Sequence, residues 1–419
     1  MNCQNKPYPM VDGSFIQWDM ASSWDNSDWL SEFAVLKEAG MHYVVISTCS
    51  TTRGTVTKTI YNTHYPEFEM ENIPHDIVDY CLRNAQKTGM KVFLGIHFNE
   101  DWWKKSTKDS TWLYSQMEIG NKVAYELYHN YYPKYKNAFF GWYWVYEVDN
   151  GRFRTKKHFA MLANALNINL DFMEKHHIRL PIMLSPYMNF LLSTARGYAK
   201  NWSYVFNNTN LKKGDIFCPQ DCIGGGGLRL RHLDHWFKEL KKAVDAKPGL
   251  LFWGNVENFD HKNWSSAPLK RFIKQLRIES KYVSNFITFA YSHYYSPNNI
   301  DPGYHQMYLK YVKNGHLPNL TPSPPVNVKV VHKNNENIIT WNHPNDTAGI
   351  CGYHVYRNHK KMFTTRVQRK YGENGTGPVT MFIDKPVLSS LFKYEYYVQS
   401  YNFVGNVSKL VKAKTMSST

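Results

Sequence analysis

The sequence predicts an α/β fold, a (β/α)8 barrel, with a small all-β sandwich domain at its C-terminal end. Roughly the first 300 residues alternate short apolar runs of strand type with amphipathic segments of helical period, the pattern of a parallel sheet covered by helices. Eight such strands occur, the number that closes a barrel. A proline-rich segment then leads into a region of short alternating strands only. The 419 residues suffice for one barrel and one small module.

The eight expected barrel strands are rich in Val, Ile, Phe, Tyr and Trp, as strands buried on both faces of a parallel sheet should be. In chain order they are Ser14–Trp18, Tyr43–Thr48, Lys91–His97, Phe139–Tyr146, Pro181–Ser185, Ile216–Gln220, Leu250–Val256 and Phe286–Tyr291.

The segments between these strands carry helical spacing and helix boundary signals. Ser27 precedes apolar residues spaced i, i+3, i+4 and i+7, and Gly40 ends that segment. The expected helices are Ser27–Ala39, Pro74–Thr88, Ser115–Tyr132, Thr155–His176, Thr194–Phe206, Arg231–Ala246 and Ala267–Ser280.

Glycine patterns argue against a nucleotide-binding sheet. No Gly-rich phosphate fingerprint follows the first strand. The run Gly224–Gly227 follows a late strand and lacks the Lys-Ser/Thr of a P-loop, so we interpret it as a flexible loop at the active face.

The domain boundaries are expected at residues 10–316 for the barrel, 317–325 for a proline-rich linker and 326–415 for the sandwich. Trp341, and Tyr394 six residues after Leu388, resemble the pattern of fibronectin type III domains. The resemblance implies that Tyr394 is a corner tyrosine whose hydroxyl bonds back to the backbone. We expect this domain to be a spacer or packing partner. Its strands are expected at Val326–Val331, Ile338–Trp341, Tyr353–Arg357, Thr380–Asp384 and Tyr394–Tyr401.

The chain is basic, with a formal net charge of +16. Residues 321–419 hold 13 Lys and Arg against 5 Asp and Glu, a charge of +8 on about a quarter of the chain. The charge indicates either a well-solvated basic surface or attraction to an anionic glycan or cell surface. The Lys and Arg residues are scattered and do not form a basic run with interleaved aromatics, so we expect no nucleic-acid partner.

Six dispersed cysteines form neither a disulfide framework nor a zinc-binding pattern, and we expect no metal or organic cofactor. No apolar run is long enough for a membrane helix, and the sequence shows no signal peptide. The polar start Met1–Pro9 suits a mature N-terminus, with Cys3 as a candidate for lipid attachment. These features suggest a secreted, periplasmic or cell-surface protein, which we expect to be a monomer.

Two glutamates end the most apolar strands. "FFGWYWVYEVDN" leads into Glu147 and "LLFWGNVENFD" into Glu257, at the strand ends where barrels place their active sites. A carboxylate there is costly unless it is hydrogen-bonded or functional, and apolar surroundings raise its pKa, which suits an acid catalyst. Asp221 in "CPQDCIGGGG" is a third candidate. For all three carboxylates, a structural or substrate-binding role is the alternative.

The other strand ends carry amides, histidines and aromatic rings. Amides and hydroxyls can hold sugar hydroxyls, while Trp and Tyr rings can stack on the C–H face of a pyranose. Aromatic residues make up 16% of the chain, and some of these side chains instead fill the core. The candidate substrate-binding residues are Trp18, His97, Asn99, Glu100, Trp102, Tyr146, Tyr187, Gln220, Trp253, Asn255, Tyr291 and His293.

The motifs "GSFIQ", "GWYWVYEVDN", "PQDCIG", "WGNVENFD" and "FAYSHYYSP" together resemble a glycoside-hydrolase-like TIM-barrel family of secreted bacterial proteins, long treated as a domain of unknown function. The resemblance spans roughly residues 10–310. Acidic residues at the ends of strands four and seven are also similar to the clan of retaining (β/α)8 glycosidases. That likeness implies Glu147 as acid/base and Glu257 as nucleophile. Tyr146 departs from the Asn usual in the clan, so Asp221 stays a candidate.

We therefore expect hydrolysis of a glycosidic bond in a bacterial or host glycan. A carboxyl separation of about 5–5.5 Å would indicate retention of configuration, and about 6.5–9.5 Å inversion. One alternative is a non-catalytic glycan-binding protein of a polysaccharide-uptake system. Another is a lyase or transglycosylase acting on an acidic glycan.

Overall fold

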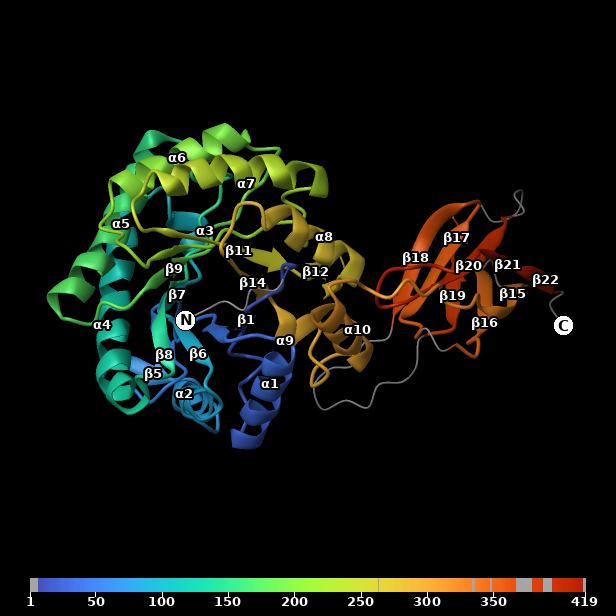
Figure 1. Ribbon diagram of the computed structural model, residues 1–419, viewed down its shortest axis with the longest axis horizontal. Helices are drawn as coiled ribbons and strands as arrows, with labels where there is room; N and C mark the ends of the chain where they lie inside the picture. The colour runs from blue at the N-terminus through green and yellow to red at the C-terminus, as the bar shows by residue number, and fades with distance from the viewer. Residues whose placement is uncertain are drawn as a thin grey trace. The chain divides into compact units, whose positions relative to one another are not determined.

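The fold is described from a computed structural model, which describes residues 7–262, 264–333, 336–346, 349–366, 379–386 and 394–416. The chain divides into two compact units (Figure 1). The first comprises Met1–Ala267 and Phe272–Tyr294, and the second Pro268–Arg271 and Tyr295–Thr419.

The first unit contains a closed barrel of eight parallel strands, which confirms the predicted fold class. The strands follow one another around the barrel in chain order, so the last pairs with the first. Each coincides with a predicted run. They are β1 (Gly13–Ile16), β2 (Tyr43–Ile46), β6 (Lys91–Gly95), β8 (Phe139–Trp144), β9 (Ile182–Leu184), β10 (Ile216–Phe217), β11 (Leu251–Glu257) and β14 (Asn285–Phe289).

Helices surround this barrel (Figure 1). The first helix begins earlier than its expected start because Asp25, rather than Ser27, caps it through bonds from the backbone N–H groups of Ser27 and Asp28. The outer helices are α1 (Asn26–Glu38), α2 (Ile77–Thr88), α4 (Ser110–Tyr135), α5 (Lys156–Lys175), α6 (Ala195–Asn207), α7 (Leu230–Asp245) and α8 (Leu269–Glu279).

The barrel interior is filled by large side chains from all eight strands. Burying a side chain of this size contributes roughly 1.5–3 kcal/mol. The interior is thus a packed core, and any site must lie at an end of the barrel. The core residues include Phe15, Val45, Phe93, Tyr143, Met183, Ile216, Trp253 and Ile287.

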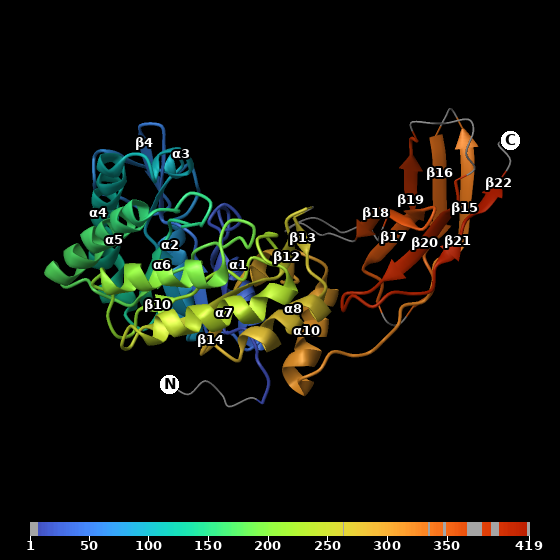
Figure 2. The same ribbon diagram turned by 90° about the horizontal axis from the view of Figure 1, so that it is seen from above.

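Additional short strands and helices lie at the end of the barrel where its strands finish. A four-stranded sheet is built from β3 (Ser50–Arg53), β4 (Val56–Thr59), β5 (Phe68–Met70) and β7 (His97–Asn99). A hairpin pairs β12 (Phe259–Asp260) with β13 (Ser265–Ser266), and the short helices α3 (Trp102–Lys105) and α9 (Tyr291–Tyr294) complete this region. Figure 2 shows β4, α3 and the β12–β13 hairpin at the same end of the barrel.

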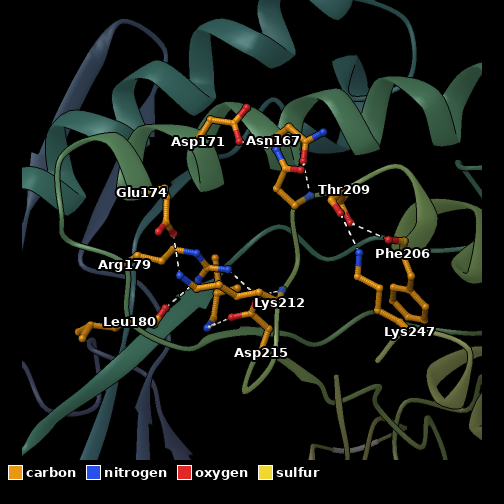
Figure 3. Close-up of polar contacts among 12 residues, drawn as sticks. Asn167, Asp171, Glu174, Arg179, Leu180, Phe206, Thr209, Lys212, Asp215 and Lys247 are labelled. Carbon is orange, nitrogen blue, oxygen red and sulfur yellow. Dashed lines mark hydrogen bonds and ion pairs between the residues drawn. The ribbon is translucent and has the colours of Figure 1, made fainter. Parts of the chain in front are cut away.

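The opposite end, where the strands begin, is tied together by a buried ion pair (Figure 3). Arg179 precedes β9 and Asp215 precedes β10, and their charged groups are 2.5 Å apart with side chains 4% and 1% exposed. Asp215 also accepts hydrogen bonds from the backbone N–H groups of Ile182 and Lys212, at 3.1 and 2.7 Å. This carboxylate is therefore fully engaged in joining two strand starts.

The second unit begins with α10 (Pro302–Asn314), a helix that the sequence did not predict, and continues as an all-β domain. One sheet has the order β19-β16-β15-β22 and the other β18-β17-β20-β21, and side chains from both form one core around Trp341 and Tyr353. The strands are β15 (Val326–Lys333), β16 (Glu336–Asn342), β17 (Gly352–Arg357), β18 (Lys360–Arg366), β19 (Met381–Asp384), β20 (Tyr396–Tyr401), β21 (Val411–Lys412) and β22 (Lys414–Met416).

This two-sheet architecture is the expected sandwich, while its likeness to fibronectin type III domains stays a prediction. Tyr394 is half-buried, with the guanidinium of Arg357 4.9 Å from its ring centre. Leu388 and Cys3 lie outside the described residues. Among the helices of the described ranges, none is long and apolar enough to cross a membrane.

Candidate active site

Glu147 lies just beyond β8, at the end of the barrel where the strands finish. The side-chain amide of Gln220 donates a hydrogen bond of 2.9 Å to its Oε2, and the Trp102 indole N–H donates one of 3.0 Å to its backbone carbonyl. Burial raises the pKa of Glu147, and the nearby charge of Asp149 raises it further. The Gln220 bond and the positive charge of Arg152 oppose this rise. The net rise favours a carboxyl group that keeps its proton, as a general acid must.

Glu257 is the last residue of β11, and only 2% of it is exposed. The backbone N–H of Gly225 donates a 2.6 Å hydrogen bond to its Oε2. A fixed main-chain donor at that distance stabilises negative charge on the oxygen. The side chains of the two glutamates therefore accept hydrogen bonds from different donors. Glu147 accepts from the half-buried amide of Gln220, and Glu257 accepts from a backbone N–H.

The loop Gly224–Gly227 is packed against Glu257, in contrast to the flexible loop that we expected. A Cβ added to Gly224 would lie 2.5 Å from the carbonyl oxygen of Phe259 and 2.9 Å from the Cβ of Glu257. A Cβ on Gly227 would lie 2.3 Å from the carbonyl oxygen of Met188. Side chains at these positions would push the loop away, so the glycines permit the approach of its backbone to Glu257.

Tyr187 connects the two glutamates. Its hydroxyl donates a 3.3 Å hydrogen bond to the carbonyl of Gly225, in the loop that holds Glu257. Its backbone N–H also donates a 2.9 Å hydrogen bond to the carbonyl of Val148, the residue after Glu147. Tyr187 therefore contacts both the loop that holds Glu257 and the backbone beside Glu147, so the two glutamates lie in the same region of the barrel end.

Asp221 is fully buried beneath Glu257. Its Oδ1 accepts bonds from the backbone N–H groups of Ile223 and Glu257, at 3.0 and 3.3 Å. Its Oδ2 accepts a hydrogen bond from the side-chain amide of Gln275. The same amide also donates a 3.0 Å hydrogen bond to the backbone carbonyl of Glu257. Asp221 thus binds the backbone around Glu257 and does not open to solvent.

A second buried acid, Glu279 of α8, lies against Asp221. It is fully buried, and neither of its carboxyl oxygens has a donor among the residues that the structure describes. Burial raises its pKa well above the usual value, and the adjacent Asp221 carboxylate raises it further. Both effects favour the protonated form of the Glu279 carboxyl group beside Asp221. Sequence reasoning missed this residue because nothing in a helical Glu signals its burial.

Of four further substrate-binding candidates, Gln220 and Asn255 lie beside the glutamates, and Trp18 and His293 lie at the end of β1. Gln220 holds Glu147, as described above, and Trp18, two residues after β1, is partly exposed. The Nε2 of His293 accepts a 3.5 Å bond from the Gln17 backbone N–H, and burial lowers the pKa of His293 to about 4, so the ring is neutral. Asn255 is buried, and its side-chain N–H donates a 3.0 Å hydrogen bond to the Ser185 hydroxyl oxygen. Its Oδ1 accepts no hydrogen bond within the described ranges.

The three residues at the third strand end have structural partners. His97 is 1% exposed and contacts Ser50 at 3.2 Å, and burial lowers its pKa to about 4. Asn99 donates a 2.8 Å bond to Gln116 of α4. Glu100 is exposed and pairs with Arg53 at 2.7 Å, in a surface ion pair.

Four expected sugar contacts are instead buried aromatic side chains. Trp102 is fully buried, and its indole N–H donates a hydrogen bond to the backbone carbonyl of Glu147. Trp253 belongs to the barrel core, and Tyr291 is fully buried. The Tyr146 ring packs against the Trp102 ring, with ring centres 4.8 Å apart. The Tyr146 hydroxyl has no hydrogen-bond partner in the part of the chain that the structure describes. An aromatic residue near a strand end packs or binds depending on tertiary surroundings that a sequence does not reveal.

Two side chains at this face, Arg152 and Trp264, were missing from the expected set. Arg152 bonds Asp149 at 2.6 Å and lies over the exposed ring of Trp103. Trp264 is exposed on the β12–β13 hairpin. Tyr294 stacks on Phe259 with ring centres 5.4 Å apart, and burial raises its pKa to about 12, with a smaller contribution from the charge of Glu257. Within the described residues, no three His, Cys, Asp or Glu side chains gather as metal ligands would.

Comparison with known proteins places this geometry in context. The sequence profile of one family, "Domain of unknown function (DUF4434)", matches residues 11–301, and none of the curated proteins matches the chain. The chain is similar to a structure from Bacteroides thetaiotaomicron described as a "putative alpha-L-fucosidase", with TM-score 0.61 and 22% identity over 75% of this chain and 98% of that chain. It is also similar to an endo-beta-1,4-mannanase from Thermotoga petrophila, with TM-score 0.47 and 10% identity over 99% of each chain. The first likeness shows the fold alone.

Proposed function

The chain belongs to the DUF4434 family, and we propose that its barrel is a glycoside hydrolase that cleaves a glycosidic bond in a bacterial or host glycan. The observation that carries this proposal is the position of Tyr187, which contacts the Gly225 loop that holds Glu257 and the backbone beside Glu147, at the end of the barrel where active sites lie. Paired carboxyl groups, one held protonated and one held as an anion, are what hydrolysis of a glycoside requires.

In the proposed reaction, Glu147 gives its proton to the oxygen of the leaving sugar. Glu257 attacks the anomeric carbon and forms a glycosyl-enzyme, which water then hydrolyses while Glu147 takes the proton from that water. This double displacement retains the configuration. The Gly225 N–H stabilises the carboxylate form of Glu257 that the attack needs, and the burial of Glu147 supports its role as acid.

The surrounding residues divide into two groups in this proposal. Tyr187, Gln220, Asn255, His293 and Trp18 are the residues that hold the reacting sugar. The side-chain amide oxygen of Asn255, buried without a donor in the described ranges, is suited to accept a bond from a sugar hydroxyl. Asp221 is a positioning residue, because its oxygens bind the backbone beside Glu257.

We also propose that the protein is secreted, periplasmic or displayed at the cell surface, and that it acts as a monomer. A glycan too large to cross the cell membrane is met outside it, which supports this location. The net charge of +16 supports an anionic glycan as one class of substrate. Size-exclusion chromatography with light scattering tests the monomer.

The test is a hydrolysis assay on a panel of neutral and anionic glycans with the wild type, Glu147→Gln and Glu257→Gln. Glu174→Gln is the matched control, because Glu174 is an exposed carboxylate in a surface ion pair with Lys212, away from the candidate residues. We expect kcat/KM to fall at least about a hundredfold in both active-site variants and to stay unchanged in the control. Circular dichroism checks folding.

Other outcomes would redirect the proposal. Activity that survives either substitution would move the catalytic role to another carboxylate. Binding of a glycan without turnover by any variant would identify a non-catalytic glycan-binding protein. NMR of the first-formed product tests retention, since an inverting enzyme would release the opposite anomer.

A further inference from the structure

We propose that Trp103 and Trp264 are two outer sugar-binding platforms, and that the ligand is a glycan chain crossing both glutamates rather than a single terminal sugar. This inference rests on the proposed function, because it takes Glu147 and Glu257 as the centre of the site. It adds the length of the ligand and the position of its outer contacts.

Trp264 has the form of a stacking platform. It is 64% exposed, the largest exposed fraction of any tryptophan with an exposed side chain in the described ranges. Its ring is stacked on Phe259 at 5.5 Å and 11°, so that its exposed area belongs to the other face and the edge. Exposing so large an apolar ring costs free energy in water, and burying it against a ligand recovers that free energy.

A row of stacked rings connects Trp264 to Glu257. Phe259 lies between Trp264 and Tyr294, with its ring centre 5.4 Å from that of Tyr294. The Phe259 backbone adjoins Glu257, because a Cβ on Gly224 would lie 2.5 Å from the Phe259 carbonyl oxygen and 2.9 Å from the Glu257 Cβ. Trp264 is therefore connected to the surroundings of Glu257 through the Phe259 ring, which is the place of an outer subsite and not of the reacting sugar.

Trp103 occupies the corresponding position beside Glu147. It is 42% exposed on α3, and the Arg152 guanidinium lies 4.3 Å from its ring centre. Arg152 is fixed in turn by its 2.6 Å bond to Asp149. The Phe98 ring centre lies 6.1 Å from that of Trp103 and 5.7 Å from that of Tyr146. Tyr146 directly precedes Glu147, so the Trp103–Arg152 pair lies near that glutamate. The cation holds one face of the indole and leaves the remaining exposed area to a ligand.

The barrel topology separates the two tryptophans across the site. Trp103 lies in the connection after β6, the third strand of the ring, and Trp264 lies in the connection after β11, the seventh. In a ring of eight strands, the third and seventh are diametrically opposed. A ligand that contacts both rings must cross the whole end of the barrel, passing the region where Glu147 and Glu257 converge. That path requires a chain of several sugars and favours cleavage within it.

The experiment measures binding of the full-length protein to an array of neutral and anionic oligosaccharides of one to eight sugar units. The variants are Trp103→Ala and Trp264→Ala, and Tyr125→Ala is the control, because Tyr125 is 38% exposed on the outer helix α4. We expect wild-type affinity to rise with chain length. Each tryptophan variant should lose about tenfold for the longest chains and little for the shortest. The control should bind as the wild type does.

The outcomes separate this inference from the proposed function. Length-dependent binding that needs both tryptophans but brings no hydrolysis would support the platforms and contradict the hydrolase. Wild-type affinity for one sugar equal to that for eight would overturn the platforms, as would unchanged binding of long chains by both tryptophan variants. Failure of the wild type to bind any glycan of the array would overturn them as well.

Discussion

Both ends of the barrel carry buried polar side chains, but these side chains differ in how many of their hydrogen-bonding atoms have protein partners. Where the strands begin, the Asp215 carboxylate receives the Arg179 guanidinium and two backbone N–H groups (Figure 3). Where the strands finish, Glu147 receives one amide donor on its side chain and has a raised pKa. At that end, Asn255 and Tyr146 also bury polar atoms that have no partner in the described ranges.

The difference shows where each end contributes. A fully engaged ion pair has no capacity left for a ligand, so its role is to hold strand starts in place. Polar atoms without protein partners are costly in the folded state and can be satisfied only by water or a ligand. The starting end of the strands thus serves stability, and the finishing end holds the polar atoms of the proposed site.

Breaking the ion pair should give the largest loss of stability. Asp215→Asn leaves the Arg179 charge buried without compensation, and we expect the free energy of unfolding to fall by about 3–5 kcal/mol. Urea denaturation measures this loss. Lys241→Ala, which removes an exposed pair with Asp245 on α7, is the control and should cost at most about 0.5 kcal/mol. Reduced activity of the folded Asp215→Asn protein would show that the two ends are coupled.

A smaller effect is expected from Glu279→Gln, and it depends on pH. In the unfolded chain Glu279 loses its proton near the usual pKa, whereas the folded protein holds the proton to higher pH. The wild type therefore loses stability as pH rises between those two values. Gln keeps a donor for Asp221 but does not titrate, so the variant should exceed the wild type in stability at pH 9 and not at pH 4. Thermal denaturation at both values tests this, and a pH-independent difference would contradict it.

The smallest change is expected from Gln220→Leu. The Gln220 amide lowers the pKa of Glu147 by binding its charged form, so its removal should raise that pKa. Glu147 would then keep its proton to higher pH, and the alkaline limb of the rate profile should move upward. We expect the maximal kcat to fall by less than the roughly hundredfold that loss of a general acid costs. An alkaline limb that stays in place would assign it to another group.

The sequence was informative wherever burial is uniform along a segment. Each barrel strand is apolar on both faces, so Phe139–Tyr146 and Leu250–Val256 could be recognised as strands, and Glu147 and Glu257 stood out at their ends. The four-stranded sheet at that end was missed. Its strands Ser50–Arg53 and Val56–Thr59 are short and rich in polar residues, so they show no core-facing pattern.

The roles of individual side chains could be predicted less well. Trp102 and Trp103 are adjacent in sequence, yet one is fully buried and the other is 42% exposed. Their difference comes from packing of α3 against residues far along the chain, such as Phe153 and Glu147. Gln275 and Glu279 are ordinary helical residues in the sequence, and only the fold brings them to Asp221.

The glycine loop has a consequence for redesign of the site. On the side of Glu257 that faces Gly224 and Gly225, the wall consists of main chain, so there is no side chain to trim when a larger ligand must be admitted. Point substitutions in directed evolution toward bulkier substrates could therefore not enlarge the site on this side of Glu257. Widening would have to come from Tyr187 or Trp18, or from shortening the loop itself. Selected variants should therefore accumulate changes on one flank of the site and spare the other.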